Sequence, residues 1–251
     1  MANAENKRGV GRILWLTLTG LILILFLSSC ATRIQSLEFR TDDLKGEALL
    51  CRPEGEGPFP AVVYNHGLVV DRIGYQGASQ RGYNLDGFCR ALAKEGYLAF
   101  IPLRKSGLGN IESHRREVFE AVDYLKGLPL VDPKRLALMG FSRGGLLTLM
   151  VGVERSDLKA LLILAPAPGR GHFARALKRV ARLSAPVLLL VAADDSAHIL
   201  EDFETLREAL LLHKKPSRII RYTKGGGHKL FWDIGYWWPD VIKFLKENLA
   251  G

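Results

Sequence analysis

The chain has 251 residues, of which 48% are hydrophobic and 24% charged, and its formal net charge is +9. This length and composition suit one large globular domain with a sizeable core. No long basic tract, internal repeat or low-complexity segment occurs, so we expect neither a nucleic-acid partner nor a repeat architecture. The positive charge instead suits solubility or attraction to an anionic surface.

The N-terminal segment has the pattern of a targeting sequence. Residues 13–27 are almost entirely apolar, and the cations before them are Lys7, Arg8 and Arg12. Fifteen residues suit a signal-peptide core better than a bilayer span. The end of this run, Leu-Ser-Ser-Cys, resembles the lipobox of bacterial lipoproteins. That resemblance implies a signal peptide over residues 1–29 and lipid attachment at Cys30. An uncleaved membrane anchor is the alternative, and either would hold the protein outside the cytoplasm, in the periplasm or cell envelope.

Residues 30–36 are expected to form a tether, and residues 37–251 a single domain. Hydrophobic periodicity predicts the elements of this domain. In chain order they are strands 37–40, 47–52 and 61–64, helix 85–95, strand 97–102, helix 113–127, strand 136–139, helix 145–153, strands 158–164 and 187–191, helix 201–213, strand 218–222 and helix 238–249. Alternating strands and helices predict an α/β fold with a mostly parallel, twisted sheet and helices on both faces.

The segment Gly140-Phe141-Ser142-Arg143-Gly144 joins an apolar strand to an apolar helix. Gly-x-Ser-x-Gly in this context is typical of a nucleophile elbow, in which a sharp turn exposes a serine hydroxyl. Side chains at the glycine positions would collide with the neighbouring elements. An ordinary glycine-rich turn is the alternative. We expect Ser142 to be a nucleophile.

A serine hydroxyl needs a general base, and the base needs an acid that orients it. Asp194 and Asp195 follow the strand at 187–191, where the carboxyl ends of parallel strands gather ligand-binding groups. A solvated loop or a helix cap is the alternative role for these acids. His228 follows a strand and three glycines, so a flexible loop can bring its imidazole to Ser142.

The strand at 61–64 ends at Asn65-His66-Gly67. Main-chain amides after this strand and after Ser142 can point at the oxygen of a tetrahedral intermediate. We therefore expect the N–H groups of Leu68 and Arg143 to form an oxyanion hole, with His66 in a structural role.

Together these segments resemble the α/β-hydrolase superfamily, and within it the dienelactone-hydrolase-like and prolyl-oligopeptidase-like esterases. The resemblance extends over about residues 37–249. The segments that carry it are 64–67 (YNHG), 102–109 (PLRKSGLG), 140–145 (GFSRGG), 192–195 (AADD) and 227–228 (GH).

In these esterases the acid stands three residues after a small residue at a strand end, which here is Ala192, so the resemblance implies Asp195 rather than Asp194. The chain also departs from the pattern. Dienelactone hydrolases proper have a nucleophilic cysteine where this chain has Ser142, so lactone specificity does not carry over. The usual second glycine of the oxyanion loop is replaced by Leu68.

The expected function is that of a serine hydrolase. It would cleave carboxylic esters of small or medium acyl groups through Ser142, His228, Asp195 and an acyl-enzyme. It would use no cofactor or metal, and its partners would be a small-molecule ester and, through the N-terminal segment, a membrane. A peptidase or acyltransferase with the same triad is an alternative, and so is a non-catalytic lipoprotein that keeps the fold as a binding module.

Two further features leave alternatives open. Cys51 and Cys89 could pair in an oxidising compartment, but their apolar neighbours favour two buried free thiols. The insert at 166–185 carries apolar residues at helical spacing and cations around them. It could rest on anionic headgroups, offer cations to a substrate carboxylate or phosphate, or simply pack on the core as a solvated helix.

Overall fold

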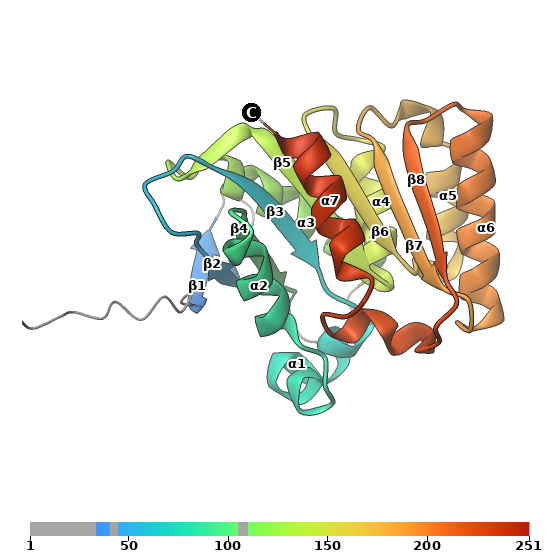
Figure 1. Cartoon of the computed structure of the whole chain (residues 1–251), viewed down its shortest axis with the longest axis horizontal. Helices are drawn as coiled ribbons and strands as arrows, with labels where there is room; N and C mark the ends of the chain where they lie inside the picture. The colour runs from blue at the N-terminus through green and yellow to red at the C-terminus, as the bar shows by residue number, and fades with distance from the viewer. Residues whose placement is uncertain (1–33, 41–44, 105–109, 251) are drawn as a thin grey trace, which may run out of the picture. The chain divides into compact units, whose positions relative to one another are not determined.

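The computed structural model describes residues 34–40, 45–104 and 110–250 (Figure 1). The signal peptide expected at 1–29, the expected lipid site at Cys30 and most of the tether lie outside these residues. Within the described part of the chain, no helix is both long enough and apolar enough to cross a membrane.

An eight-stranded sheet forms the centre of the domain. Its order is β1-β2-β4-β3-β5-β6-β7-β8. The strands are β1 (Ile34–Arg40), β2 (Lys45–Cys51), β3 (Phe59–Asn65), β4 (Leu98–Leu103), β5 (Val131–Phe141), β6 (Ala160–Leu164), β7 (Val187–Ala192) and β8 (Ser217–Tyr222). The pairs made by β1 and β2 are antiparallel, and all pairs from β4 to β8 are parallel. The predicted mostly parallel sheet is therefore confirmed.

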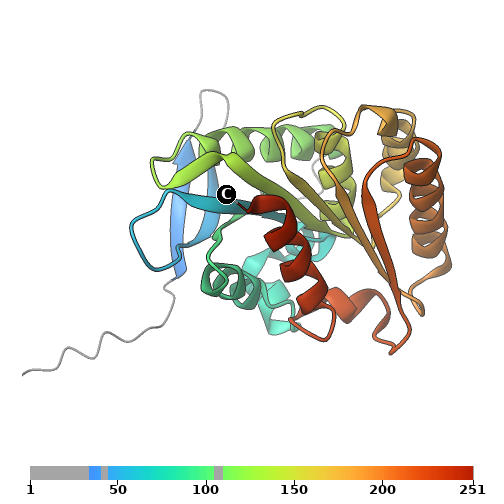
Figure 2. The ribbon, with the colours of Figure 1, turned by 45° about the horizontal axis from the view of Figure 1, so that its top comes forward.

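Helices cover both faces of this sheet. They are α1 (Leu68–Gln80), α2 (Leu85–Lys94), α3 (Ile111–Lys126), α4 (Arg143–Gly152), α5 (His172–Leu177), α6 (Ala197–Leu212) and α7 (Trp238–Leu249). Helices α2 and α7 lie in front of the sheet in Figure 1, whereas α3 and α4 lie behind it. Figure 2 shows the same separation from a second direction. Strands β6 and β7 are buried along their whole length, as their unbroken apolar runs predict.

Helix α1 is absent from the elements that periodicity predicts. Only three of its residues are buried: Val70, Asp71 and Ala78. Its backbone breaks at Gly74, where φ is 73°. Because a short helix with internal glycines and a mostly exposed surface has little apolar period, its sequence gives a weak helical signal.

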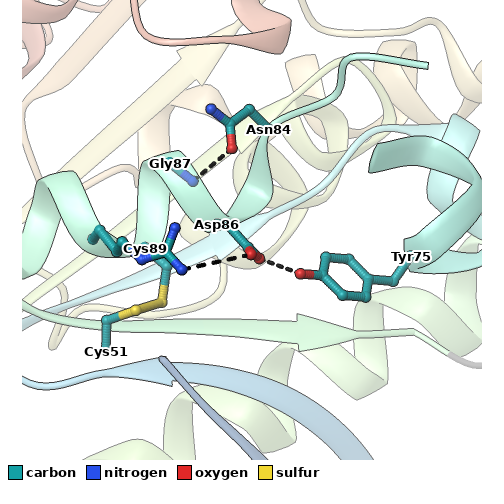
Figure 3. The surroundings of a disulfide bond; sticks show 7 residues. Cys51, Tyr75, Asn84, Asp86, Gly87 and Cys89 are labelled. Carbon is teal, nitrogen blue, oxygen red and sulfur yellow. Dashed lines mark hydrogen bonds and ion pairs between the residues drawn. A yellow bond between two sulfur atoms is a disulfide. The ribbon is translucent and has the colours of Figure 1, made fainter. Parts of the chain in front are cut away.

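A disulfide joins Cys51, at the end of β2, to Cys89 in α2 (Figure 3). The expectation of two free thiols is therefore wrong. Helix α2 packs against β2 and β4. This packing brings the two cysteines together among their apolar neighbours. In the same region the side chain of Asn84 caps α2 by accepting from the Gly87 N–H at 2.8 Å. The Tyr75 hydroxyl, from α1, donates to Asp86 in α2.

The basic insert forms the short helices η1 (Gly169–Gly171), α5 and η2 (Val180–Arg182). Phe173 and Val180 are buried in the core. The apolar residues of the insert therefore pack on the core, as expected for a solvated helix. On its outer side, Arg179 forms an ion pair with Glu154 at 2.6 Å.

Candidate active site

Ser142 sits in the tight turn between β5 and α4, with a φ of 55° and a ψ of −116°. A serine in this region of backbone space is strained, so the surrounding hydrogen bonds must hold it there. Its N–H donates to the carbonyl of Leu164 at 2.9 Å, and its own carbonyl accepts from Ala167 at 3.0 Å. Both partners belong to β6 or the segment that follows it, so the neighbouring strand fixes the turn.

The two glycines of the motif leave no room for side chains. A Cβ on Gly144 would lie 1.9 Å from the carbonyl oxygen of Asn65, and one on Gly140 would lie 2.2 Å from that of Gly144. Such distances are far inside van der Waals contact, so the backbones of β3, β5 and α4 approach each other only because these residues are glycine. This close approach brings the end of β3 beside Ser142.

The three residues predicted to form a triad are connected by two contacts, both made by the imidazole of His228. His228 Nε2 is 2.9 Å from Ser142 Oγ, and His228 Nδ1 is 2.9 Å from Asp195 Oδ2. The Asp195 side chain is fully buried, while that of His228 is 35% exposed. The other oxygen of Asp195 accepts from the Ser196 N–H at 2.7 Å. A carboxylate held in this way fixes the orientation of the imidazole.

The loop that carries His228 is anchored by the neighbouring acid, Asp194. Gly225, Gly226 and Gly227 all have positive φ, a conformation that other residues adopt only with strain. The N–H groups of Gly226 and Gly227 donate to the two carboxylate oxygens of Asp194 at 3.1 and 3.0 Å. The adjacent acids thus divide two tasks, since Asp195 contacts the imidazole and Asp194 shapes its loop.

Leu68 and Arg143, the predicted oxyanion residues, are the first residues of α1 and α4. N–H groups at this position have no acceptor within their own helix and carry the positive end of its dipole. Both residues line the same cavity as Ser142. The turn before α1 is held in place, because the Gly67 N–H donates to the buried Tyr83 hydroxyl at 3.1 Å.

A buried network of charged residues supports this turn. Arg104, which follows β4, donates to both carboxylate oxygens of Asp71 at 2.9 and 3.0 Å. It also donates to the main-chain carbonyl of His66 at 2.7 Å. Burial, and then the charge of Arg104, lower the pKa of His66 well below its usual value. His66 is therefore neutral at pH 7 and structural, in line with its expected role.

The side chain of Arg143 joins the same network from α4. Its guanidinium donates to His114 Nδ1 at 3.1 Å and lies 3.7 Å from Asp71. Burial, and then Arg104, lower the pKa of His114 to about 4, so this imidazole is neutral and accepts the hydrogen bond. The network therefore connects α1, α3 and α4 around the base of the candidate site.

Sequence reasoning missed the supporting residues Asp71, Arg104, His114 and Asp194. Arg104 stands in the PLRKSGLG segment, but its partner Asp71 gives no signal of its own. The role of Asp194 in holding the glycine loop is visible only in its three-dimensional contacts. The tryptophans near His228 belong mainly to the core, where Trp237 and Trp238 are buried. Across residues 34–40, 45–104 and 110–250, no three side chains of types that bind metals are grouped closely enough to hold an ion.

An α/β fold with a strained serine between strand and helix, whose hydroxyl contacts a histidine that in turn contacts an acid, defines the class of α/β-hydrolase folds. The profile of the dienelactone hydrolase family matches residues 47–233. Because this match covers most of the chain, the chain belongs to the dienelactone hydrolase family.

The chain is also similar to a curated protein over part of its length. The quorum-quenching protein AidA of Acinetobacter baumannii (strain MDR-ZJ06) is 26% identical over 140 residues, which are 52% of this chain and 43% of AidA. The match therefore spans less than half the length of that protein.

Two solved structures share the fold. A putative dienelactone hydrolase from Klebsiella pneumoniae (MGH 78578) has a TM-score of 0.68 and 20% identity, covering 86% of this chain and 99% of that one. The acylaminoacyl peptidase of Pyrococcus horikoshii has a TM-score of 0.69 and 15% identity, with 87% and 42% covered. Family membership supports a hydrolase, and these neighbours show that the fold is shared.

Proposed function

We propose that the protein is a serine hydrolase that cleaves carboxylic esters of small or medium acyl groups. The observation that carries this proposal is the continuous chain of contacts from Ser142 through His228 to Asp195, with 2.9 Å at each step. Family membership supports the hydrolase class, and the site supplies the chemistry.

In the proposed reaction, Ser142 Oγ attacks the ester carbonyl carbon while His228 Nε2 takes the hydroxyl proton. Asp195 stabilises the resulting imidazolium and keeps Nδ1 protonated. The carbonyl oxygen becomes an oxyanion, which accepts hydrogen bonds from the N–H groups of Leu68 and Arg143. When the tetrahedral intermediate collapses, the ester C–O bond breaks and His228 returns the proton to the leaving alkoxide.

Water then completes the cycle. His228 is partly exposed, so a water molecule can reach it and lose a proton to Nε2 as its oxygen attacks the acyl-enzyme. The second tetrahedral intermediate breaks the bond to Ser142 Oγ, which regains its proton from His228. The product acid leaves, and no cofactor is consumed.

Covalent labelling with a fluorophosphonate tests the nucleophile. We expect the wild-type protein to be labelled, and Ser142→Ala to lose both the label and the hydrolysis of para-nitrophenyl esters. Ser79→Ala removes an exposed serine of α1 and should keep both. Folded wild-type protein that takes up no label would favour a non-catalytic binding module.

A peptidase with the same triad is the second candidate, and the similarity in fold to an acylaminoacyl peptidase favours it over other uses of the site. An acyltransferase would use the same acyl-enzyme but pass the acyl group to an acceptor other than water. Turnover of matched esters, lactones and aminoacyl amides, with and without an added alcohol acceptor, separates the three activities.

We also propose that the enzyme works outside the cytoplasm, tethered to a membrane at Cys30. The Cys51–Cys89 disulfide supports an oxidising compartment, because disulfides seldom persist in the cytosol. Metabolic labelling with an alkyne fatty acid tests the tether: wild-type protein should be labelled and Cys30→Ala should not. An unlabelled wild-type protein with an intact N-terminus would instead show an uncleaved anchor.

A further inference from the structure

A cavity of about 500 Å³ opens beside Ser142. Apolar side chains such as Ile111 and Leu146 form part of its wall. Its charged lining is entirely basic, because three arginines contribute to it and none of the described acidic residues does. These residues are Arg72, Arg143 and Arg170. A substrate held at Ser142 would therefore lie against a positively charged wall.

The three arginines come from separate elements. Arg72 belongs to α1, Arg143 begins α4, and Arg170 belongs to η1 in the basic insert. Arg72 and Arg170 lie close enough to act on Arg143. Burial lowers the pKa of Arg143, the charges of Arg104, Arg72 and Arg170 lower it further, and Asp71 opposes them. Bringing like charges together costs free energy unless an anion is bound between them.

Asp71, the acid close to Arg143, already has a partner. Asp71 accepts two hydrogen bonds from Arg104 and is 3.7 Å from Arg143, so a single carboxylate faces two guanidinium groups. The histidines of the network do not change this balance of charge, because the lowered pKa of both His66 and His114 keeps them neutral at pH 7. The cavity wall therefore keeps an excess of positive charge.

Arg72 and Arg170 are exposed, and neither forms an ion pair with any carboxylate in the described part of the chain. Other arginines nearby are paired, since Arg115 and Arg179 both contact Glu154 at 2.6 Å. The two unpaired guanidinium groups thus remain available to a ligand.

The backbone at Arg170 is unusual. Its φ and ψ are 52° and 49°, between Gly169 at a φ of 55° and Gly171 at a φ of 88°. An arginine in the left-handed region is uncommon, and strained residues of this kind gather at sites of function. The strain here accompanies an arginine that lines the candidate active site.

We propose that the substrate is an ester that carries a negatively charged group, which binds among Arg72, Arg143 and Arg170. The proposal rests on the proposed function, with Ser142 as the nucleophile. Guanidinium groups match carboxylate oxygens in geometry and charge. Arg143, held by His114 and Asp71, supplies a fixed charge at the base of the cavity, and the more exposed Arg72 and Arg170 close around the anion.

Two matched pairs of esters test the proposal and identify the charged half of the substrate. Para-nitrophenyl hexanoate and mono-para-nitrophenyl adipate differ by a carboxylate in the acyl half. Phenyl hexanoate and para-carboxyphenyl hexanoate differ by one in the alcohol half. We expect kcat/KM to favour the anionic member of at least one pair on the order of tenfold, and less at high salt.

The variants Arg72→Gln and Arg170→Gln should each lower this preference about threefold to fivefold, which is the upper part of the range for one exposed ion pair. Arg81→Gln and Arg182→Gln are the matched controls. Both remove an exposed arginine from the end of α1 or from the insert without touching the cavity, and should keep the wild-type preference.

Equal hydrolysis of the neutral and anionic members of both pairs would overturn the anionic substrate while leaving the serine hydrolase intact. An unchanged preference in both arginine variants would overturn the assigned residues. If no ester is hydrolysed and a fluorophosphonate leaves Ser142 unlabelled, the proposed function itself fails, and the anionic substrate fails with it.

Discussion

At the scale of single residues, the pair Asp194-Asp195 shows how neighbours in sequence acquire different tasks. Both follow β7, yet Asp195 Oδ2 contacts His228 Nδ1, whereas Asp194 accepts from two main-chain N–H groups of the glycine loop. In the proposed reaction, Asp195 stabilises the charge that develops on the imidazole. Asp194 acts on the position of the imidazole, because it holds the loop that carries His228.

Substitution of these acids should therefore reduce activity to very different extents. Asp195→Asn should lower kcat by about 10³- to 10⁴-fold, because an amide does not stabilise the imidazolium and can select the wrong tautomer. Asp194→Ala should lower kcat on the order of tenfold with little change in KM, since it loosens the base without removing it. Asp194→Asn keeps one acceptor oxygen and should lie between Asp194→Ala and the wild type. Steady-state kinetics with a para-nitrophenyl ester provide the measurement, and equal losses at the two positions would contradict this division.

His114 provides a prediction about pH. Its pKa is lowered to about 4 by burial and by Arg104, whereas in the unfolded chain it is about 6.5. Between these values the unfolded chain binds a proton that the folded protein does not. Stability should consequently fall as the pH drops from about 6.5 to 4, by up to about 1.4 kcal/mol per pH unit from this residue.

Urea unfolding at several pH values measures this dependence. His114→Gln keeps an acceptor for Arg143 but does not titrate, so it should flatten the fall in the free energy of unfolding. His213→Gln, which changes an exposed histidine, is the control and should keep the wild-type slope. An unchanged slope in His114→Gln would show that other groups cause the acid sensitivity.

At the scale of elements, the strand-turn-helix unit of β5 and α4 was predictable because its signal is local. The motif places Gly140, Ser142 and Gly144 within five residues, between two apolar runs. In the structure these runs are β5 and α4. The positions of Asp195 and His228 were predictable for a related reason. Each follows a strand, and the carboxyl ends of parallel strands meet at one edge of the sheet.

The supporting network could not be predicted in this way. Asp71 and Arg104 follow different strands and meet only because β3 and β4 are neighbours in the sheet. Arg170 is a similar case. The apolar spacing in the insert predicts a helix with cations around it, but α5 has only six residues. Arg170, which lines the cavity, precedes this helix.

The glycines of the elbow give a prediction about this element. Gly144→Ala and Gly140→Ala should each lower the free energy of unfolding by about 2–4 kcal/mol and reduce kcat, because main-chain atoms must move to admit the Cβ. Gly127→Ala, with its nearest atom at 3.5 Å and an ordinary backbone, should change stability by less than about 1 kcal/mol. Calorimetry and ester kinetics check both quantities, and wild-type stability in Gly144→Ala would refute the close approach.

At the scale of the whole domain, the candidate site depends on strands from both halves of the sheet. The turn after β3 carries the Leu68 amide, and the elbow after β5 carries the candidate nucleophile Ser142 and the Arg143 amide. The ends of β7 and β8 bring the acid and the histidine. These four strands and β6 form the continuous order β3-β5-β6-β7-β8. Strand β6 accepts the Ser142 N–H at the carbonyl of Leu164. A rigid sheet therefore sets the triad geometry.

The disulfide lies away from the candidate site and contributes to the stability of the fold. It joins residues 38 apart in sequence, and in the chain-entropy account a closed loop of this length stabilises the folded state by about 3–4 kcal/mol. A reductant should lower the midpoint of urea unfolding of the wild-type protein by a corresponding amount. In mild conditions esterase activity should persist, because neither cysteine lines the candidate site. Cys51→Ala/Cys89→Ala should resemble the reduced protein and ignore the reductant. An equal shift in this double variant would mean that the reductant acts elsewhere, and the absence of any shift in the wild type would argue against a stabilising disulfide and weaken the case for an oxidising compartment.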